Sequence, residues 1–286
     1  MVEESVVITC AITGGASRAD GNPNLPYTPE ELAAEARRAV DAGASVIHLH
    51  GRDPRNGAPS HDVGHLGDAV AAIRDAVPGV IINMSTGGPA PLAERISPVI
   101  AHRPEMATCA LGAYNYAAWS SDGSGLKLDR IVGTTFGVMQ ETLATFAAES
   151  VSADLECYDL GHVDNLDVLA RLGGPMPHFD VSFVLGVVGN LAADGRNLVA
   201  LADRLGPGHN WTAIVIDRER HWQVLAAAVG LGGWIRVGFE DCHWLDPDTP
   251  ATSNGQLVER AIKIVRDAGR TVAEPAAARS VLVPAR

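Results

Sequence analysis

The chain has 286 residues, 47% of them hydrophobic and 20% charged, with a formal net charge of -12. So acidic a surface repels nucleic acid and anionic membranes, and we expect neither as a partner. No apolar run is long enough to cross a bilayer, and the acidic start lacks the basic segment of a secretory signal. The 4 cysteines are scattered, which favours a reducing compartment, and we expect a cytoplasmic protein.

Short β-branched runs alternate with helical segments along the chain. The expected strands cover residues 6–12, 45–50, 80–84, 105–108, 154–158, 179–185, 211–216 and 234–237. The expected helices cover residues 28–42, 62–76, 91–101, 138–151, 163–172, 197–205, 220–230 and 253–268. Crossovers of this length suit parallel strands, so we predict an α/β fold, a (β/α)8 TIM barrel, built as a single domain over residues 1–286.

A doubly wound sheet is the alternative fold. It would open its first helix with Gly-x-Gly-x-x-Gly, which residues 13–18 do not offer. An irregular stretch that contains Tyr114, Tyr116 and Trp119 follows the fourth expected strand.

Two histidines end the second expected strand. His48 and His50 point to the same face of that strand, because side chains alternate along it. Two imidazoles on one face are half of a metal site. The alternative is that they are unrelated, one buried and one solvated.

Polar residues gather where the expected strands end, and in a TIM barrel the chemistry lies at those ends. They are Ser85, Thr108, Glu156, Arg236, Glu240 and Asp241. Arg236 and Glu240 share a face if the last strand extends that far. His48, His50 and Glu240 would then bind zinc and leave the fourth position open, as catalytic zinc sites do. The alternative for Glu240 is a solvated loop carboxylate.

The chain resembles the β-keto acid cleavage enzymes in blocks spread from one end to the other. They read NPNLP at 22–26, TPEE at 28–31, AGASVIHLH at 42–50, RD at 52–53, STGG at 85–88, PEMAT at 104–108, GH at 161–162, FVLGV at 183–187, RVGFED at 236–241 and SNGQLVERA at 253–261. The resemblance implies a zinc-dependent (β/α)8 barrel, usually a homo-oligomer, with a tetramer favoured. It also implies that a β-keto acid and acetyl-CoA condense to give acetoacetate and a new acyl-CoA.

The resemblance also assigns roles to individual residues. His48, His50 and Glu240 match the zinc ligands, Ser85, Gly88 and Thr108 the contacts to the substrate, Asp241 the general base, and Arg236 and Glu156 its charged neighbours. We expect the Arg236 guanidinium to lower the pKa of Asp241, so zinc on the keto oxygen would be needed to make this weak base sufficient. The alternative for Arg236 and Asp241 is a structural ion pair.

One departure concerns the substrate tail. Family members that act on amino-bearing substrates carry a Gly-Ala-Glu run after the first strand, where this chain has Gly14-Gly15-Ala16. The missing carboxylate predicts a neutral or apolar tail rather than a cationic one, and an anionic tail would fit if Arg18 turns inward. Residues 108–112 also lack the Asp common in the family, which leaves that pocket wall open to change.

Two other functions remain open. A metal-dependent amidohydrolase-like hydrolase would also use His-x-His, but on its first strand and with further histidines on the fifth and sixth. His162 and His178, at the start of a helix and of a strand, fit that poorly, and we assign the other histidines, His61 among them, to surface or core. The third function is a catalytically silent metal-binding barrel. For CoA, backbone amides of residues 186–190 are a candidate phosphate cradle.

Overall fold

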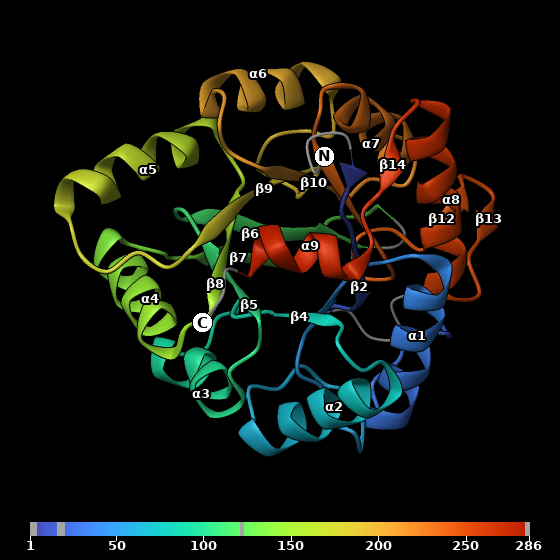
Figure 1. Ribbon diagram of the computed structural model, residues 1–286, viewed down its shortest axis with the longest axis horizontal. Coiled ribbons are helices and arrows are strands. Elements are labelled where there is room, and N and C mark those ends of the chain that lie inside the picture. Colours follow the sequence, from blue (N-terminus) through green and yellow to red (C-terminus); the bar gives the residue numbers. More distant parts are fainter. Residues whose placement is uncertain (1–4, 16–20, 121–122, 284–286) are drawn as a thin grey trace.

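Eight parallel strands close into a barrel in the computed structural model, which describes residues 5–15, 21–120 and 123–283 (Figure 1). In chain order they are β2 (Ile8–Thr13), β3 (Val46–Leu49), β4 (Ile81–Met84), β5 (Met106–Ala110), β8 (Ser152–Cys157), β9 (Phe179–Leu185), β10 (Trp211–Val215) and β11 (Trp234–Val237). Each overlaps an expected strand, and β11 pairs with β2 to close the ring. The predicted TIM barrel is confirmed.

Helices surround the barrel (Figure 1). They are α1 (Pro29–Ala42), α2 (Val63–Ala76), α3 (Leu92–His102), α4 (Phe136–Glu149), α5 (Leu160–Leu172), α6 (Gly195–Leu205), α7 (His221–Gly230) and α8 (Asn254–Asp267). Helix α1 begins where the sequence predicts, because the Thr28 side chain accepts from the Glu31 amide and the Glu31 side chain accepts from the Thr28 amide. The start of α5 lies three residues before the predicted one. Among the residues described, no helix is both long and apolar enough to span a membrane.

The two ends of the barrel differ. Helix α9 (Pro275–Leu282) lies across the end where the strands begin, and Arg279 fixes it there by donating to the carbonyls of Gly79 and Val80. At the other end a hairpin forms from β6 (Tyr114–Trp119) and β7 (Leu126–Val132), behind α9 in the view of Figure 1. The prediction of an irregular stretch there was wrong.

Two short pairings complete the chain. β1 (Ser5–Val6) pairs in parallel with β14 (Thr271–Val272), and β12 (Trp244–Asp246) pairs antiparallel with β13 (Thr249–Pro250). These pairings form small sheets of their own, separate from the barrel.

The barrel interior is polar. Asp154 accepts from the amide of Asn83 at 2.7 Å and from the hydroxyl of Ser182 at 2.5 Å, and all three side chains are buried. The apolar core lies between the strands and the helices, where Ile47 and Leu49 are fully buried. Because side chains alternate along β3, His48 takes the opposite face, toward this polar interior. The fold thus places chemistry inside the barrel and hydrophobic packing outside it.

Candidate active site

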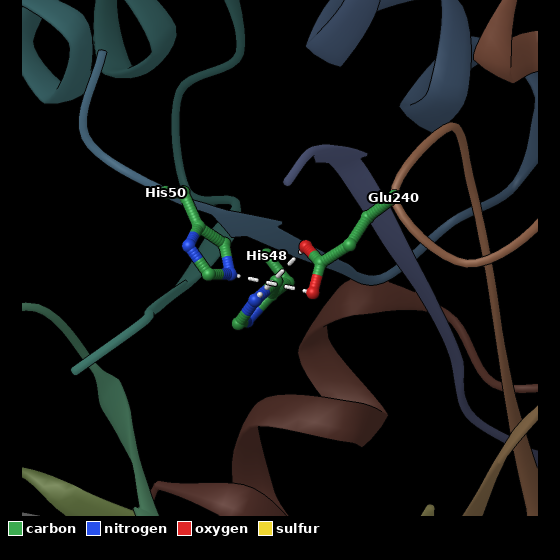
Figure 2. Close-up of side chains that lie close together, drawn as sticks. All are labelled: His48, His50 and Glu240. Atoms are coloured by element: carbon green, nitrogen blue, oxygen red, sulfur yellow. Dashed lines mark ion pairs between the residues drawn. The ribbon is translucent and has the colours of Figure 1, made fainter. Parts of the chain in front are cut away.

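Two imidazoles and a carboxylate meet at the mouth of the barrel (Figure 2). His48 lies on β3, His50 directly follows it, and Glu240 comes from the loop after β11. Nε2 of His48 is 3.3 Å from Oε2 of Glu240, and Nε2 of His50 is 3.3 Å from Oε1. One ligand atom from each residue can be chosen so that all lie within 4.8 Å of one another. The structure therefore brings together the group that the sequence singled out.

The bonding of this group fits a metal ion. Both ring nitrogens of His48 and Oε2 of Glu240 are buried, and none has a hydrogen-bond partner among the residues described. Buried polar atoms without partners are costly and rare in folded proteins. Burial also lowers the pKa of His48, which favours the neutral imidazole that binds metal. Two imidazoles and one carboxylate are a donor set that zinc accepts.

A tight turn delivers Glu240. Strand β11 ends at Val237, and Gly238 follows with φ 142°, a conformation that favours glycine. The carbonyl of Gly238 accepts from the amides of Asp241 and Cys242 at 3.1 and 3.0 Å. The strand ends at Val237 as predicted, so the condition of a strand that extends to Glu240 is not met, because this turn rotates the chain out of the sheet.

Glycine at position 14 makes room for the Glu240 side chain. A Cβ on Gly14 would stand 2.5 Å from Cγ of Glu240, well inside van der Waals contact. The carbonyl of Gly14 accepts from the buried guanidinium of Arg52, which fixes this segment from the other side. The carboxylate is therefore held by backbone shape as well as by charge.

A buried guanidinium links the two acids of the last loop. Nε and Nη2 of Arg236 donate to Oδ2 and Oδ1 of Asp241 at 2.9 and 2.6 Å, and Nη2 also donates to Oε1 of Glu240 at 3.0 Å. Burial nevertheless raises the pKa of Asp241 to about 6, because its effect exceeds the lowering of that pKa by the Arg236 guanidinium. The predicted lowering of this pKa was wrong, because the sequence did not reveal how completely the site is desolvated.

Glu156 is a second buried acid of the interior. It lies on β8, accepts from the Tyr158 hydroxyl at 3.0 Å, and has its pKa raised to about 7 by burial and by the nearby charge of Asp154. The Tyr158 ring stacks on Tyr114 at the base of the hairpin, with centroids 3.7 Å apart. Sequence reasoning missed both tyrosines, since nothing in their spacing indicates a stack.

The residues after β4 and on β5 form one connected wall. The Thr108 hydroxyl accepts from the Thr86 amide at 3.1 Å, while the Thr86 hydroxyl donates to the Thr108 carbonyl at 2.7 Å. The Ser85 hydroxyl accepts from the amide of Gly87 at 3.2 Å. Both Ser85 and Thr108 are buried; Ser85 follows β4, the neighbour of the strand that carries His48, and Thr108 lies on β5, one strand further round the barrel.

One histidine assigned to surface or core lies at the mouth instead. Nε2 of His61 is 3.1 Å from the position that a Cβ on Gly88 would take. Burial lowers the pKa of His61, and the charge of His50 lowers it further. Gly88 itself has φ 130°. No sequence signal distinguishes His61, because it lies in a loop that only the fold folds back toward the site.

Comparison with known proteins identifies the family. The model of the β-keto acid cleavage enzyme family matches residues 5–283. The chain belongs to this family. It is 37% identical over 284 residues to the 3-keto-5-aminohexanoate cleavage enzyme of Fusobacterium nucleatum, covering 98% of each chain. It is 30% identical to the 3,5-dioxohexanoate:acetyl-CoA acetone transferase of Paraburkholderia graminis, with 98% of this chain and 96% of the relative covered.

Solved structures show the same fold. A binary complex of ObcA with oxaloacetate matches with a TM-score of 0.70 at 20% identity, over 91% of this chain and 67% of the other. At this identity the likeness supports the barrel alone. Like its relatives, which are named as cleavage or transferase enzymes, this family member is an enzyme.

The histidines that an amidohydrolase would need are used elsewhere. His162 accepts from the Tyr158 amide at 3.1 Å and contacts the Ala113 carbonyl at 3.2 Å. His178 pairs with Asp180 at 3.6 Å where β9 begins, at the end of the barrel away from the mouth. The amidohydrolase alternative therefore has no support among these residues.

The glycine loop after β9 holds the hairpin. The side-chain amide of Asn115 donates to the Gly189 backbone carbonyl at 2.9 Å, and the side-chain amide of Asn190 donates to the Asn115 backbone carbonyl at 2.8 Å. Of the backbone amides predicted to cradle phosphate at residues 186–190, those of Gly186 and Asn190 already donate to the carbonyls of Leu191 and Val187. Ala16 and Arg18, on which the predicted tail specificity depends, lie outside the described residues.

Proposed function

We propose that this enzyme is a zinc-dependent transferase that converts a β-keto acid and acetyl-CoA into acetoacetate and a new acyl-CoA. One observation carries the proposal: a buried set of two imidazoles and a carboxylate with unpaired atoms adjoins a buried Arg–Asp pair. Two relatives support the substrate class by their names, 3,5-dioxohexanoate:acetyl-CoA acetone transferase and 3-oxoadipate:acetyl-CoA acetyltransferase.

His48, His50 and Glu240 would hold the zinc ion. When bound, zinc supplies Lewis-acid stabilisation of negative charge on the keto oxygen of the substrate. The neutral imidazole of His48, favoured by burial, is ready to bind without first losing a proton. The absent side chain of Gly14 leaves the space that Glu240 occupies, and the turn at Gly238 brings Glu240 to it.

Asp241 acts as the general base. It takes a proton from the carbon between the keto and carboxylate groups of the substrate, and Arg236 holds the carboxylate in position through two hydrogen bonds. A pKa near 6 leaves Asp241 mostly ionised at neutral pH and makes it a stronger base than an ordinary aspartate. Burial therefore improves the base, and the Arg236 pair keeps it ionised.

The carbon balance follows from the products. The deprotonated carbon forms a bond to the carbonyl carbon of acetyl-CoA, and CoA leaves as a thiolate. The thiolate then attacks the original keto carbon, and the bond between that carbon and the former carbanion breaks. The carbanion released by this cleavage takes the proton back from Asp241 and departs as acetoacetate, while the substrate tail leaves as a CoA thioester, so no oxidant or reductant is needed.

Ser85, Gly88 and Thr108 would bind the substrate carboxylate and keto acid. The hydroxyls of Ser85 and Thr108 are fixed by backbone amides, so they are oriented before substrate arrives. Glu156 would help to keep Arg236 protonated from the interior of the barrel. The charge of Glu156 raises the pKa of Arg236, and the charge of Arg236 lowers the pKa of Glu156.

The tail of the substrate would be neutral or apolar rather than cationic. Gly14 and Gly15 bring no side chain to the mouth, and residue 16 is alanine, so this segment offers no carboxylate to a cation. The expected homo-oligomer, with a tetramer favoured, and the expected cytoplasmic location stay predictions. Light scattering of the purified enzyme tests the first of them.

A substrate panel tests the function. The zinc-loaded enzyme is given acetyl-CoA with β-keto acids that carry alkyl, keto, carboxylate or ammonium tails, and acetoacetate is measured. We expect turnover of the alkyl and keto acids and its loss in Asp241→Asn. If no acid is turned over although zinc is bound at about one ion per chain, the silent-barrel alternative replaces the proposal. Preference for the ammonium tail would overturn the tail specificity alone.

A further inference from the structure

The β6–β7 hairpin spans the mouth of the barrel. It leaves the barrel after β5, and Asn115 and Ala117 of β6 contact the loop after β9 at Gly189 and Val188. Figure 1 shows it crossing behind α9, at the opposite end of the barrel. The hairpin therefore covers the site, and one of its two faces points toward the metal-ligand group.

Tyr116 marks the face that looks inward. Its hydroxyl is 3.2 Å from where a Cβ on Gly15 would stand, so the ring extends from β6 to the end of β2. Burial raises the pKa of Tyr116, and the negative charge of Glu240 raises it further. Within the described part of the chain the hydroxyl has no hydrogen-bond partner. Tyr116 thus presents an unused donor above the site.

Arg130 adds a second donor on the same face. The hairpin register places it directly opposite Tyr116, and directly opposed residues of an antiparallel pair share a face. Arg130 also acts electrostatically on the Tyr116 phenol, which confirms that they are close. It forms no ion pair or hydrogen bond with any residue that the structure describes, although the chain carries a net charge of -12. An unpaired guanidinium at the mouth of so acidic a protein is available to a ligand.

The donors define the chemistry of what they would bind. A guanidinium has only donors, and a phenol offers one O–H to a partner that lacks protons of its own. Both side chains are exposed, so water satisfies their donors in the free enzyme. An ammonium group would be repelled by Arg130, and an alkyl group would displace this water without replacing its hydrogen bonds. Among these tails, a group with acceptor oxygens replaces them.

We propose that Tyr116 and Arg130 form a subsite for the distal end of the β-keto acid and select tails that end in an acceptor oxygen, either a ketone or a carboxylate. This rests on the proposed function; it keeps the exclusion of a cationic tail, replaces the apolar tail by one that bears oxygen, and admits an anionic carboxylate. A ketone tail is neutral and a carboxylate tail is anionic, so variants of Tyr116 and Arg130 affect the two tails differently. Tyr116 contributes to both, whereas Arg130 contributes more to the carboxylate.

The test compares β-keto acids of equal length with alkyl, keto and carboxylate tails, using kcat/KM for acetoacetate formation. Tyr116→Phe removes only the hydroxyl, and Arg130→Met removes the charge but keeps the stem. Asp129→Asn is the matched control, because it changes a charge on the opposite face of the same strand. We expect Tyr116→Phe to lower kcat/KM roughly tenfold for the oxygen-bearing tails. Arg130→Met lowers it roughly tenfold for the carboxylate tail, and both leave the alkyl tail within about twofold.

The outcomes separate this proposal from the one beneath it. If the wild-type enzyme turns over the alkyl tail as well as the others, and neither variant changes the ratio of tails, the subsite is refuted while the reaction stands. If both variants lower the rate with every tail equally, the two residues support the hairpin and select nothing, which also refutes it. If no acid is turned over at all, the proposed function itself fails.

Discussion

Adding a single methyl group at Gly14 should disable the metal site. The Cβ of Gly14→Ala would stand 2.5 Å from Cγ, 3.0 Å from Cβ and 3.2 Å from Cδ of Glu240. Ordinary carbon contacts need about 3.5 Å, so the carboxylate would have to withdraw by about 1 Å. Metal–ligand distances tolerate only about 0.2 Å, and a displacement of about 1 Å costs on the order of a hundredfold in rate.

Zinc content and activity measure this effect together. We expect Gly14→Ala to lose most of its zinc on dialysis and to fall about a hundredfold in kcat/KM, with the barrel intact by circular dichroism. The backbone of Gly14 is not left-handed, so alanine adds no strain there. Gly230→Ala in α7 is the control, since its Cβ meets nothing within 4 Å. A Gly14→Ala enzyme with full zinc content and wild-type rate would refute the reasoning.

Three further predictions concern the base, the fold and pH. Asp241→Asn should keep its zinc content while kcat/KM falls at least about a hundredfold, and loss of zinc instead would mark a structural ion pair. Asn254→Ala should destabilise the fold by about 3 kcal/mol in urea unfolding, because it removes the side-chain donor to the buried Glu35 carboxylate and the acceptor of the buried Phe239 amide; a loss under about 1 kcal/mol would contradict this. Burial lowers the pKa of His221 to about 4, and its Nδ1 contacts the Val215 carbonyl. Between about pH 6.5 and 4, His221 is therefore protonated in the unfolded chain and neutral in the folded one. Acidification through this range should cost about 3 kcal/mol of the free energy of unfolding. His221→Asn should flatten this part of the pH profile, and an unchanged slope would contradict it.

The regular part of the fold could be predicted because local signals agree with it. Thr28 and Glu31 cap α1 as their types require, and Gly43 ends it in the left-handed region. The hairpin could not be predicted, because no two-residue glycine turn joins β6 to β7, and its strands mix exposed apolar and polar residues. Pairing with the loop at Gly189, far away in sequence, stabilises it.

The site shows a similar division. The histidines of β3 were predictable from their spacing, since alternation along a strand is a local property. Glu240 joins the histidines by a route that the sequence did not indicate, because a turn at Gly238 rather than an extended strand delivers it. The pKa of Asp241 was mispredicted since desolvation depends on every element around the mouth, and the inward positions of His61 and Tyr116 depend on loops that only the fold positions.

The fate of one labelled carbon tests the central claim most directly. Acetyl-CoA labelled with carbon-13 at its carbonyl is given to the zinc-loaded enzyme with an unlabelled β-keto acid, and the products are followed by NMR. The account predicts that the label appears in the keto carbon of acetoacetate, while the new acyl-CoA carries none. Label in the new acyl-CoA, or acetoacetate without label, would contradict the proposed bond formation and with it the proposed function.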